Sequence, residues 1–464
     1  MRRFASVASG LFAVLSACGD DGGARKLADA PPAPEDGQPD SPPAATSVNI
    51  TAYARYFEKL AAMTPREGVR VFALDPANNV VAMAMTGADG KTSVELPDGG
   101  SVTIAYPDTM DGVQYYRSWV TTYVGVKPGD SLTVGDSFSE DITSGATIGS
   151  ETVRWPVLAN ATAYRLYTPC DRYGSYNPST VMATISLYEK CATTGPIVLV
   201  GYQDGNVIGT IYVSSATHAD NAMHDLATQG WATQANAPNF ISVLTGLSAD
   251  ANVNWLGAYG NYGPWSTDQV TTDIPVVSGM ASAMSSVAAT APRKTAVAHV
   301  RRPTLNGRQF FALTGTSPVT IDAGTLPIFD GFPNVDATAR KVTWQMPVGT
   351  YDHTILQFQW SYLDGVDTHR LTWNVIVPPG VTELDAAALP AALQALVPPT
   401  NDFEVVNVRV VDLASAASYD AARSLPEWQL SYPIESVHTG AHGGAAYADG
   451  GEGSNVWEPY NVPH

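Results

Sequence analysis

Aromatic and amide side chains gather between positions 254 and 265, where their types best fit ligand binding. The candidate ligand-binding residues are Asn254, Trp255, Tyr259, Tyr262 and Trp265. A sugar ring stacks its C–H face on indole while amides bond its hydroxyl groups, so the cluster predicts a glycan-binding loop without catalysis. The alternative is that Trp255 and Trp265 fill the end of a β-sandwich, because aromatic residues are common in any β structure.

Two histidine pairs raise the question of a metal site. His438 and His442 are four residues apart, which brings two ligands together on a helix, but the glycines around them disfavour a helix. His218 and His224 lie near aspartates, yet no glutamate or third ligand follows at a spacing typical of metalloenzymes. The sequence therefore predicts no metal site and no cofactor.

No catalytic residue is predicted either. The chain contains no Gly-x-Ser-x-Gly motif, no phosphate-binding loop of the Gly-x-x-x-x-Gly-Lys type and no dinucleotide-binding glycine pattern. A pair of catalytic carboxylates positioned by the fold leaves no local pattern in the sequence. A hydrolase of polysaccharide or peptide that uses two such carboxylates therefore stays open as the alternative function.

The N-terminus has the features of an export signal. Arg2 and Arg3 precede an apolar stretch over residues 4–17 that is too short to span about 30 Å of hydrocarbon. The stretch ends in Leu15-Ser16-Ala17-Cys18, which resembles the lipobox of bacterial lipoproteins. That resemblance implies lipidation of Cys18, a membrane as partner and, because Gly19 follows, the outer membrane as location. An ordinary cleaved leader is the alternative.

The other two cysteines are Cys170 and Cys191. An even pair in an exported chain favours a disulfide, which would close a loop of about twenty residues and stabilise the fold by roughly 3 kcal/mol. Two free thiols or a pair of metal ligands are the alternatives.

Composition favours β structure and disfavours nucleic acid as a partner. Lys and Arg total 25 against 44 Asp and Glu, a net charge of -19 that repels phosphate backbones. Only 15% of the 464 residues are charged, while 40 glycines and 33 prolines indicate many turns. We expect an all-β fold of tandem antiparallel β-sandwich domains.

Changes in residue pattern predict the domain boundaries. The expected segments are a signal peptide at 1–17, a disordered tether at 18–47, β-sandwiches at 48–143 and 144–216, a larger β-rich domain at 217–434 and a flexible tail at 435–464. Residues 68–107, with their Thr-x-Ala-Asp-Gly turn, resemble the transthyretin-like sandwiches of carboxypeptidase-regulatory-like and Cna-B-like domains. The next segment is similar to fibronectin-III and immunoglobulin-like domains, with Trp155 as a core residue.

The order of these segments is similar to that of surface lipoproteins of Gram-negative bacteria. The resemblance implies a lipid-anchored protein of the cell envelope with a non-enzymatic binding or structural role. A glycan or another envelope protein is the candidate ligand, and the oligomeric state is not predicted.

Overall fold

The computed structural model describes most of the chain from residue 46 onward. The described residues are 46–54, 64–107, 109–110, 115–135, 145–189, 191–233, 239–262, 265–287, 291–302, 307–324, 333–345, 350–394, 396–397, 405–413, 416–427, 430 and 442–449. Strands dominate them, and α1 (Ala391–Gln394), α2 (Tyr419–Arg423) and the 3₁₀ turn η4 (Ala386–Ala388) are short. The predicted all-β class is confirmed. The leader, Cys18, the expected tether up to residue 45 and residues 450–464 lie outside the described residues.

A small sheet opens the described chain around β1. It consists of β1 (Ser47–Ala54), β2 (Thr64–Pro65), β5 (Lys91–Glu95) and β9 (Ser131–Gly135). Strand β1 is antiparallel to β2 and β5 and parallel to β9. Its alternating Val48, Ile50 and Ala52 are fully buried, as expected of a strand with one face on a core.

The largest sheet in the described part of the chain combines strands from distant parts of the sequence. Its strands in order are β20 (Trp265–Ile274), β19 (Asn252–Tyr262), β22 (Arg293–Arg302), β23 (Gly307–Thr314), β31 (His442–Asp449), β30 (Val405–Leu413), β27 (His353–Asp364), β28 (Asp367–Val377), β8 (Tyr115–Val126), β6 (Gly100–Ala105), β3 (Arg70–Leu74) and β4 (Val80–Met85), with β7 (Thr109–Met110) beside β8. Strands β8 and β28 run parallel, with Trp119 opposite Thr372. The sheet therefore draws strands from both the 48–143 and the 217–434 stretch.

Two hairpins in this sheet follow the turn chemistry of the sequence. Between β3 and β4, Asp75 Oδ1 accepts hydrogen bonds from the backbone N–H groups of Ala77 and Asn79, as in an Asx turn. Between β27 and β28, Asp364 pairs with Asp367 across a tight turn in which Gly365 has a φ of 63°.

The tryptophans near these hairpins are core residues. Trp344, Trp360 and Trp373 are all buried, as the alternation of apolar and polar residues predicts. Trp373 stacks on Phe358 at a centroid distance of 5.0 Å, and its Nε1 donates to Thr122 Oγ1 of β8. Trp373 Nε1 thereby has the hydrogen-bond partner that a buried indole N–H favours.

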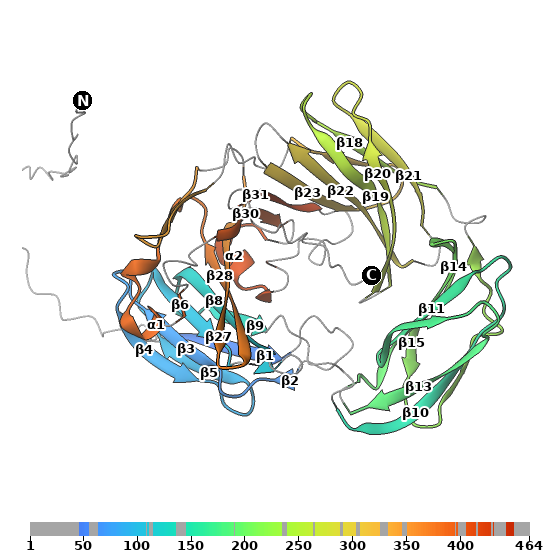
Figure 1. Ribbon diagram of the computed structural model, residues 1–464, viewed down its shortest axis with the longest axis horizontal. Helices are drawn as coiled ribbons and strands as arrows, with labels where there is room; N and C mark the ends of the chain where they lie inside the picture. Colours follow the sequence, from blue (N-terminus) through green and yellow to red (C-terminus); the bar gives the residue numbers. More distant parts are fainter. Residues whose placement is uncertain are drawn as a thin grey trace, which may run out of the picture. The chain divides into compact units, whose positions relative to one another are not determined.

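Residues 147–233 form two sheets that pack face to face (Figure 1). One consists of β13 (Met182–Tyr188), β10 (Thr147–Arg154) and β16 (Met223–Asp225), and the other of β12 (Asp171–Tyr176), β11 (Ala163–Thr168), β14 (Thr194–Gln203), β15 (Asn206–Thr217) and β17 (Ala232–Thr233). Val153, Trp155 and Ile185 of the first side meet Leu166 and Leu199 of the second in one core. Trp155 is 1% exposed, which confirms its predicted core position.

Two smaller sheets complete the described strands. They are β21 (Ala281–Ser286), β18 (Asn239–Thr245) and β24 (Val319–Asp322), and β25 (Asn334–Asp336), β26 (Lys341–Thr343) and β29 (Glu383–Asp385). Residues of the first of these sheets, such as Leu244 and Ile321, share a buried cluster with Leu256 and Ala298 of the largest sheet.

Candidate functional site

The predicted glycan-binding residues lie on a hairpin of two strands, which corrects the expectation of a loop. Asn254, Trp255 and Tyr259 belong to β19, and Tyr262 at its end pairs with Trp265 at the start of β20. Strand β19 is hydrogen-bonded to β20 on one side and to β22 on the other. This pairing satisfies its backbone and outweighs the low strand preference of its glycines.

The aromatic side chains that the structure describes on this hairpin do not form an open platform. Tyr259 is buried, and Trp255 is half-buried with its ring centroid 5.5 Å from that of His299. The side chains of Tyr262 and Trp265 lie outside the described part. Tyr259 belongs to a buried apolar cluster, and Trp255 packs against that cluster.

Two carboxyl groups with raised pKa values lie elsewhere in the fold. Burial raises the pKa of Glu427 to about 7, although Thr121 and Trp119 donate hydrogen bonds to it. Burial also raises the pKa of Asp352 to about 6, against a hydrogen bond from the Leu413 backbone N–H. The groups that donate these hydrogen bonds belong to the largest sheet, in β8 for Glu427 and in β30 for Asp352.

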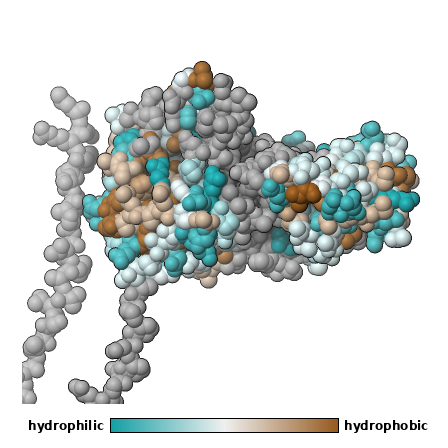
Figure 2. Space-filling view, turned by 90° about the horizontal axis from the view of Figure 1, so that it is seen from below, coloured by the Kyte–Doolittle hydropathy of each residue, from teal (hydrophilic) through white to brown (hydrophobic). Residues whose placement is uncertain are grey.

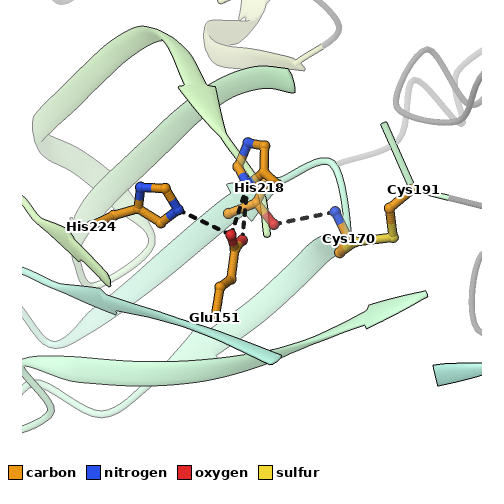
Figure 3. Close-up of a disulfide and its surroundings, with 6 residues drawn as sticks. Glu151, Cys170, Cys191, His218 and His224 are labelled. Carbon is orange, nitrogen blue, oxygen red and sulfur yellow. Dashed lines mark hydrogen bonds and ion pairs between the residues drawn. A yellow bond between two sulfur atoms is a disulfide. The ribbon is translucent and has the colours of Figure 1, made fainter. Parts of the chain in front are cut away.

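The most concentrated group of metal-ligating side chains in the described residues is formed by Glu151, His218 and His224. His218 Nδ1 lies 2.9 Å from Glu151 Oε1, and His224 Nε2 lies 3.0 Å from Glu151 Oε2 (Figure 3). One donor atom from each residue fits within 4.8 Å of the other two. The side chains of Glu151 and His218 are 0% and 1% exposed, and that of His224 is 14% exposed. We call these three residues the triad.

Three strands of the 147–233 sandwich bring the triad together. Glu151 lies within β10, His218 directly follows β15, and His224 is the middle residue of β16. Strand β16 runs parallel to β10 with His224 opposite Val153. Both histidines therefore approach the carboxylate from a short segment that lies along β10.

The turn between the two histidines is fixed to β10 by hydrogen bonds. Ser150 N donates to Asp220 Oδ1 at 2.9 Å, and Asn221 N donates to the Ser150 carbonyl at 2.7 Å. A Cβ atom at Gly149 would lie 2.4 Å from Asp220 Oδ1, so only glycine permits this close approach. The positions of His218 and His224 are thus set by the backbone.

A second contact orients the ring of His218. Its Nε2 lies 3.3 Å from the Gly195 carbonyl oxygen, an acceptor, so Nε2 carries a hydrogen. The disulfide between Cys170 and Cys191, with Cα atoms 5.3 Å apart, joins the end of β11 to the segment that leads into Gly195. Figure 3 shows the disulfide beside the triad.

The charge of Glu151 depends on the two rings. Burial alone would raise the pKa of Glu151, but hydrogen bonds and charge from His218 and His224 outweigh burial and hold the pKa below its ordinary value. The carboxylate is therefore ionised inside the sandwich, where an uncompensated negative charge would be costly. Two imidazoles and one carboxylate form a donor set suited to a zinc-class ion.

Sequence reasoning missed this group because its third member is distant. Glu151 precedes His218 by 67 residues and His224 by 73, so no local spacing relates them. One signal was present in the alternation of β10, where Glu151 shares the inward face with Val153 and Trp155. A glutamate at an inward position requires a buried partner.

Of the other histidines that the sequence singles out, only His442 lies in the described part of the chain. His442 begins strand β31, and His438 and His464 lie outside the described residues. Among the described helices, none has the length and apolar character required to cross a membrane.

Comparisons with known proteins find only weak similarity to solved structures. No protein-family model and no curated protein matches the chain. The chain is similar to the TIE protein of Bacillus anthracis at 12% identity, covering 56% of this chain and 45% of that one, with a TM-score of 0.14. A candidate adhesin from Bacteroides ovatus is 12% identical over 40% of this chain and 90% of its own length, with a TM-score of 0.15.

A third solved structure, ligand-free PulA from Klebsiella pneumoniae, is 10% identical with a TM-score of 0.14. It covers 59% of this chain, which spans 30% of that protein. TM-scores this low support no argument about function.

Proposed function

We propose that this chain is a lipid-anchored protein of the bacterial outer membrane with a non-enzymatic binding or structural role. The pairing of its cysteines carries the proposal. Of the three cysteines in the sequence, Cys170 and Cys191 form a disulfide, which leaves Cys18 at the end of the lipobox-like segment. Disulfides form and persist in oxidising compartments, so this pair supports export of the chain.

Lipidation is tested on the protein made in a Gram-negative host. Mass spectrometry of the intact protein should give a chain that begins at Cys18 and carries the mass of a diacylglycerol and a further acyl chain. The protein should fractionate with the outer membrane, and Cys18→Ser should leave the leader uncleaved by the lipoprotein pathway. An unacylated native protein in the soluble fraction would refute the proposal.

For the binding role, the structure favours another protein over a glycan as the ligand. Strand β4 is the last strand on its side of the largest sheet within the described residues, and its side chains Val81, Met83 and Met85 are 48%, 66% and 64% exposed. An edge strand offers unpaired backbone groups and alternate side chains to a partner strand. Figure 2 shows that hydrophobic and hydrophilic residues are interspersed on the face seen from below.

Crosslinking tests this surface in intact cells. A photo-reactive amino acid at position 83 should give a discrete crosslinked protein, and Met85→Lys should reduce its yield. Val366 is 73% exposed at the tip of another hairpin, so the same probe at position 366 is the matched control. Identical products from both positions would reject β4 as the binding edge. Glycan binding that is lost in Trp255→Ala would instead favour a glycan ligand.

A further inference from the structure

We propose that Glu151, His218 and His224 bind one divalent transition-metal ion of the zinc class. The ion would tie β10 to the end of β15 and to β16, within a single sandwich. The proposal concerns a site that neither the lipid anchor nor the β4 surface uses. It stands on the geometry of three side chains that converge from separate strands.

The hydrogen bond from His218 Nε2 to the Gly195 carbonyl leaves His218 Nδ1 facing the Glu151 carboxylate. Because Nε2 donates to the Gly195 carbonyl, a neutral His218 presents the lone pair of Nδ1 to Glu151, 2.9 Å away. Two electron-rich atoms at that distance repel unless a proton or a cation lies between them. Metal-bound histidines commonly donate their second ring N–H to a backbone carbonyl in this way.

The distances within the triad are close to those of a metal site. Zinc bonds of 2.0–2.1 Å at tetrahedral angles place neighbouring ligand atoms about 3.3 Å apart. Glu151 Oε2 lies 3.0 Å from both His218 Nδ1 and His224 Nε2, and no two of the three donor atoms are more than 4.8 Å apart, so the two imidazole rings would close on the ion as it binds. The His218 and His224 ring centroids are 5.4 Å apart, and a nitrogen of each ring contacts the Glu151 carboxylate.

The donor types select the ion. Two imidazole nitrogens and one carboxylate suit zinc, cobalt, nickel or copper, whereas magnesium and calcium prefer oxygen ligands. Three protein ligands leave one tetrahedral position for water. The 14% exposure of the His224 side chain puts solvent on its side of the triad.

The surrounding structure holds the triad rigidly, as a binding site requires. The turn that contains Asp220 is hydrogen-bonded to Ser150 of β10, and His218 N donates to the Thr193 carbonyl at 2.9 Å. Thr193 lies two residues beyond Cys191 of the disulfide. Because these contacts order the ligands before the ion binds, little conformational entropy opposes binding.

Titration calorimetry of the purified full chain, stripped with a chelator, tests the proposal. Zinc should bind with a stoichiometry of one, and a large excess of magnesium should not compete. Cobalt in place of zinc should give the visible absorption of a four-coordinate ion. Zinc should also raise the melting temperature in proportion to the logarithm of its concentration, because the ion binds the folded state.

Variants locate the ion. Glu151→Gln and His224→Gln should each weaken zinc binding tenfold or more, and both keep side chains that can hydrogen-bond to their neighbours. A chain with His438→Gln and His442→Gln is the matched control, because it removes the other histidine pair, and it should bind as the natural chain does. Near-ultraviolet circular dichroism verifies that each variant is folded.

Two results would overturn the proposal. The first is an absence of stoichiometric zinc binding in the natural chain, in which case the triad is only a hydrogen-bonded group that neutralises Glu151. The second is zinc binding that survives in folded Glu151→Gln and His224→Gln but is lost when His438 and His442 are replaced.

Discussion

Arg423 is paired with Asp130 across 293 positions of the chain, with Arg423 Nη2 2.6 Å from Asp130 Oδ2. The guanidinium is 1% exposed, and its Nη1 donates to the Gly125 carbonyl at 3.0 Å. The contact fastens helix α2 to the turn between β8 and β9. Tertiary packing alone brings Arg423 and Asp130 together, since nothing in the local sequence relates the two residues.

Replacement of Arg423 should therefore destabilise the fold. Arg423→Met removes three hydrogen bonds at a buried position, and we expect the free energy of unfolding to fall by about 2–3 kcal/mol. Asp130 is 26% exposed, so water partly compensates its lost partner. Urea denaturation followed by tryptophan fluorescence measures the change.

Lys127 supplies the matched control for that variant. It pairs with Asp420, and both side chains are 50% exposed. Lys127→Met should lower the free energy of unfolding far less than Arg423→Met does, because exposed ion pairs contribute little. Equal losses in the two variants would contradict the assigned role of Arg423.

The buried Glu427 should make stability fall as pH rises. Burial raises its pKa from 4.5 to about 7 in the folded chain, so between these values the folded state binds a proton that the unfolded state has lost. The associated stability is fully present below pH 4.5 and is lost by about pH 7. The rise of the Glu427 pKa from 4.5 to about 7 corresponds to about 3 kcal/mol.

Glu427→Gln tests this dependence, since glutamine cannot ionise and still accepts the hydrogen bond of Thr121. Urea denaturation at pH 5 and pH 8 should give a smaller loss of stability for the variant than for the natural chain. The same loss in both proteins would show that Glu427 does not titrate in this range.

The buried His353 should make stability fall as pH falls, which is the opposite of the effect of Glu427. Burial lowers its pKa from 6.5 to about 4, although a hydrogen bond from its Nε2 to the Leu430 carbonyl opposes the shift. The unfolded chain then binds a proton that the folded chain does not, so stability is present above pH 6.5 and is lost as pH falls toward 4.

His353→Gln should remove this loss, which amounts to about 3 kcal/mol across the window. Denaturation at pH 4.5 and pH 6.5 measures it, and Glu427→Gln is a useful comparison because its effect on the slope has the opposite sign. A His353→Gln profile identical to that of the natural chain would contradict the prediction.

The disulfide should stabilise the 147–233 sandwich. Cys170 and Cys191 are 21 residues apart, and closing a loop of that length restricts the unfolded chain by about 3 kcal/mol. The double variant Cys170→Ser, Cys191→Ser should melt at a lower temperature than the natural chain. Dithiothreitol should lower the melting temperature of the natural chain and leave that of the double variant unchanged, whereas no response in either would exclude a stabilising disulfide.

Much of the β structure was readable from neighbouring residues. Apolar and polar residues alternate along Leu356–Tyr362 and Leu371–Val377, which predicts two strands, and Asp364-Gly365 predicts the turn between them. Burial of Trp155, Trp344 and Trp373 follows from the same period of two. These features depend on residues within one hairpin, so a short stretch of sequence contains all the information they need.

Contacts between distant strands cannot be predicted from such local patterns. The parallel pairing of β8 with β28, the bond from Arg423 to Asp130 and the triad of Glu151, His218 and His224 each join residues whose spacing carries no signal. Many pairings of strands would satisfy the same alternation, and only the packing of whole sheets selects one of them. The local pattern thus specifies which residues face inward, whereas the three-dimensional fold specifies which inward residues meet.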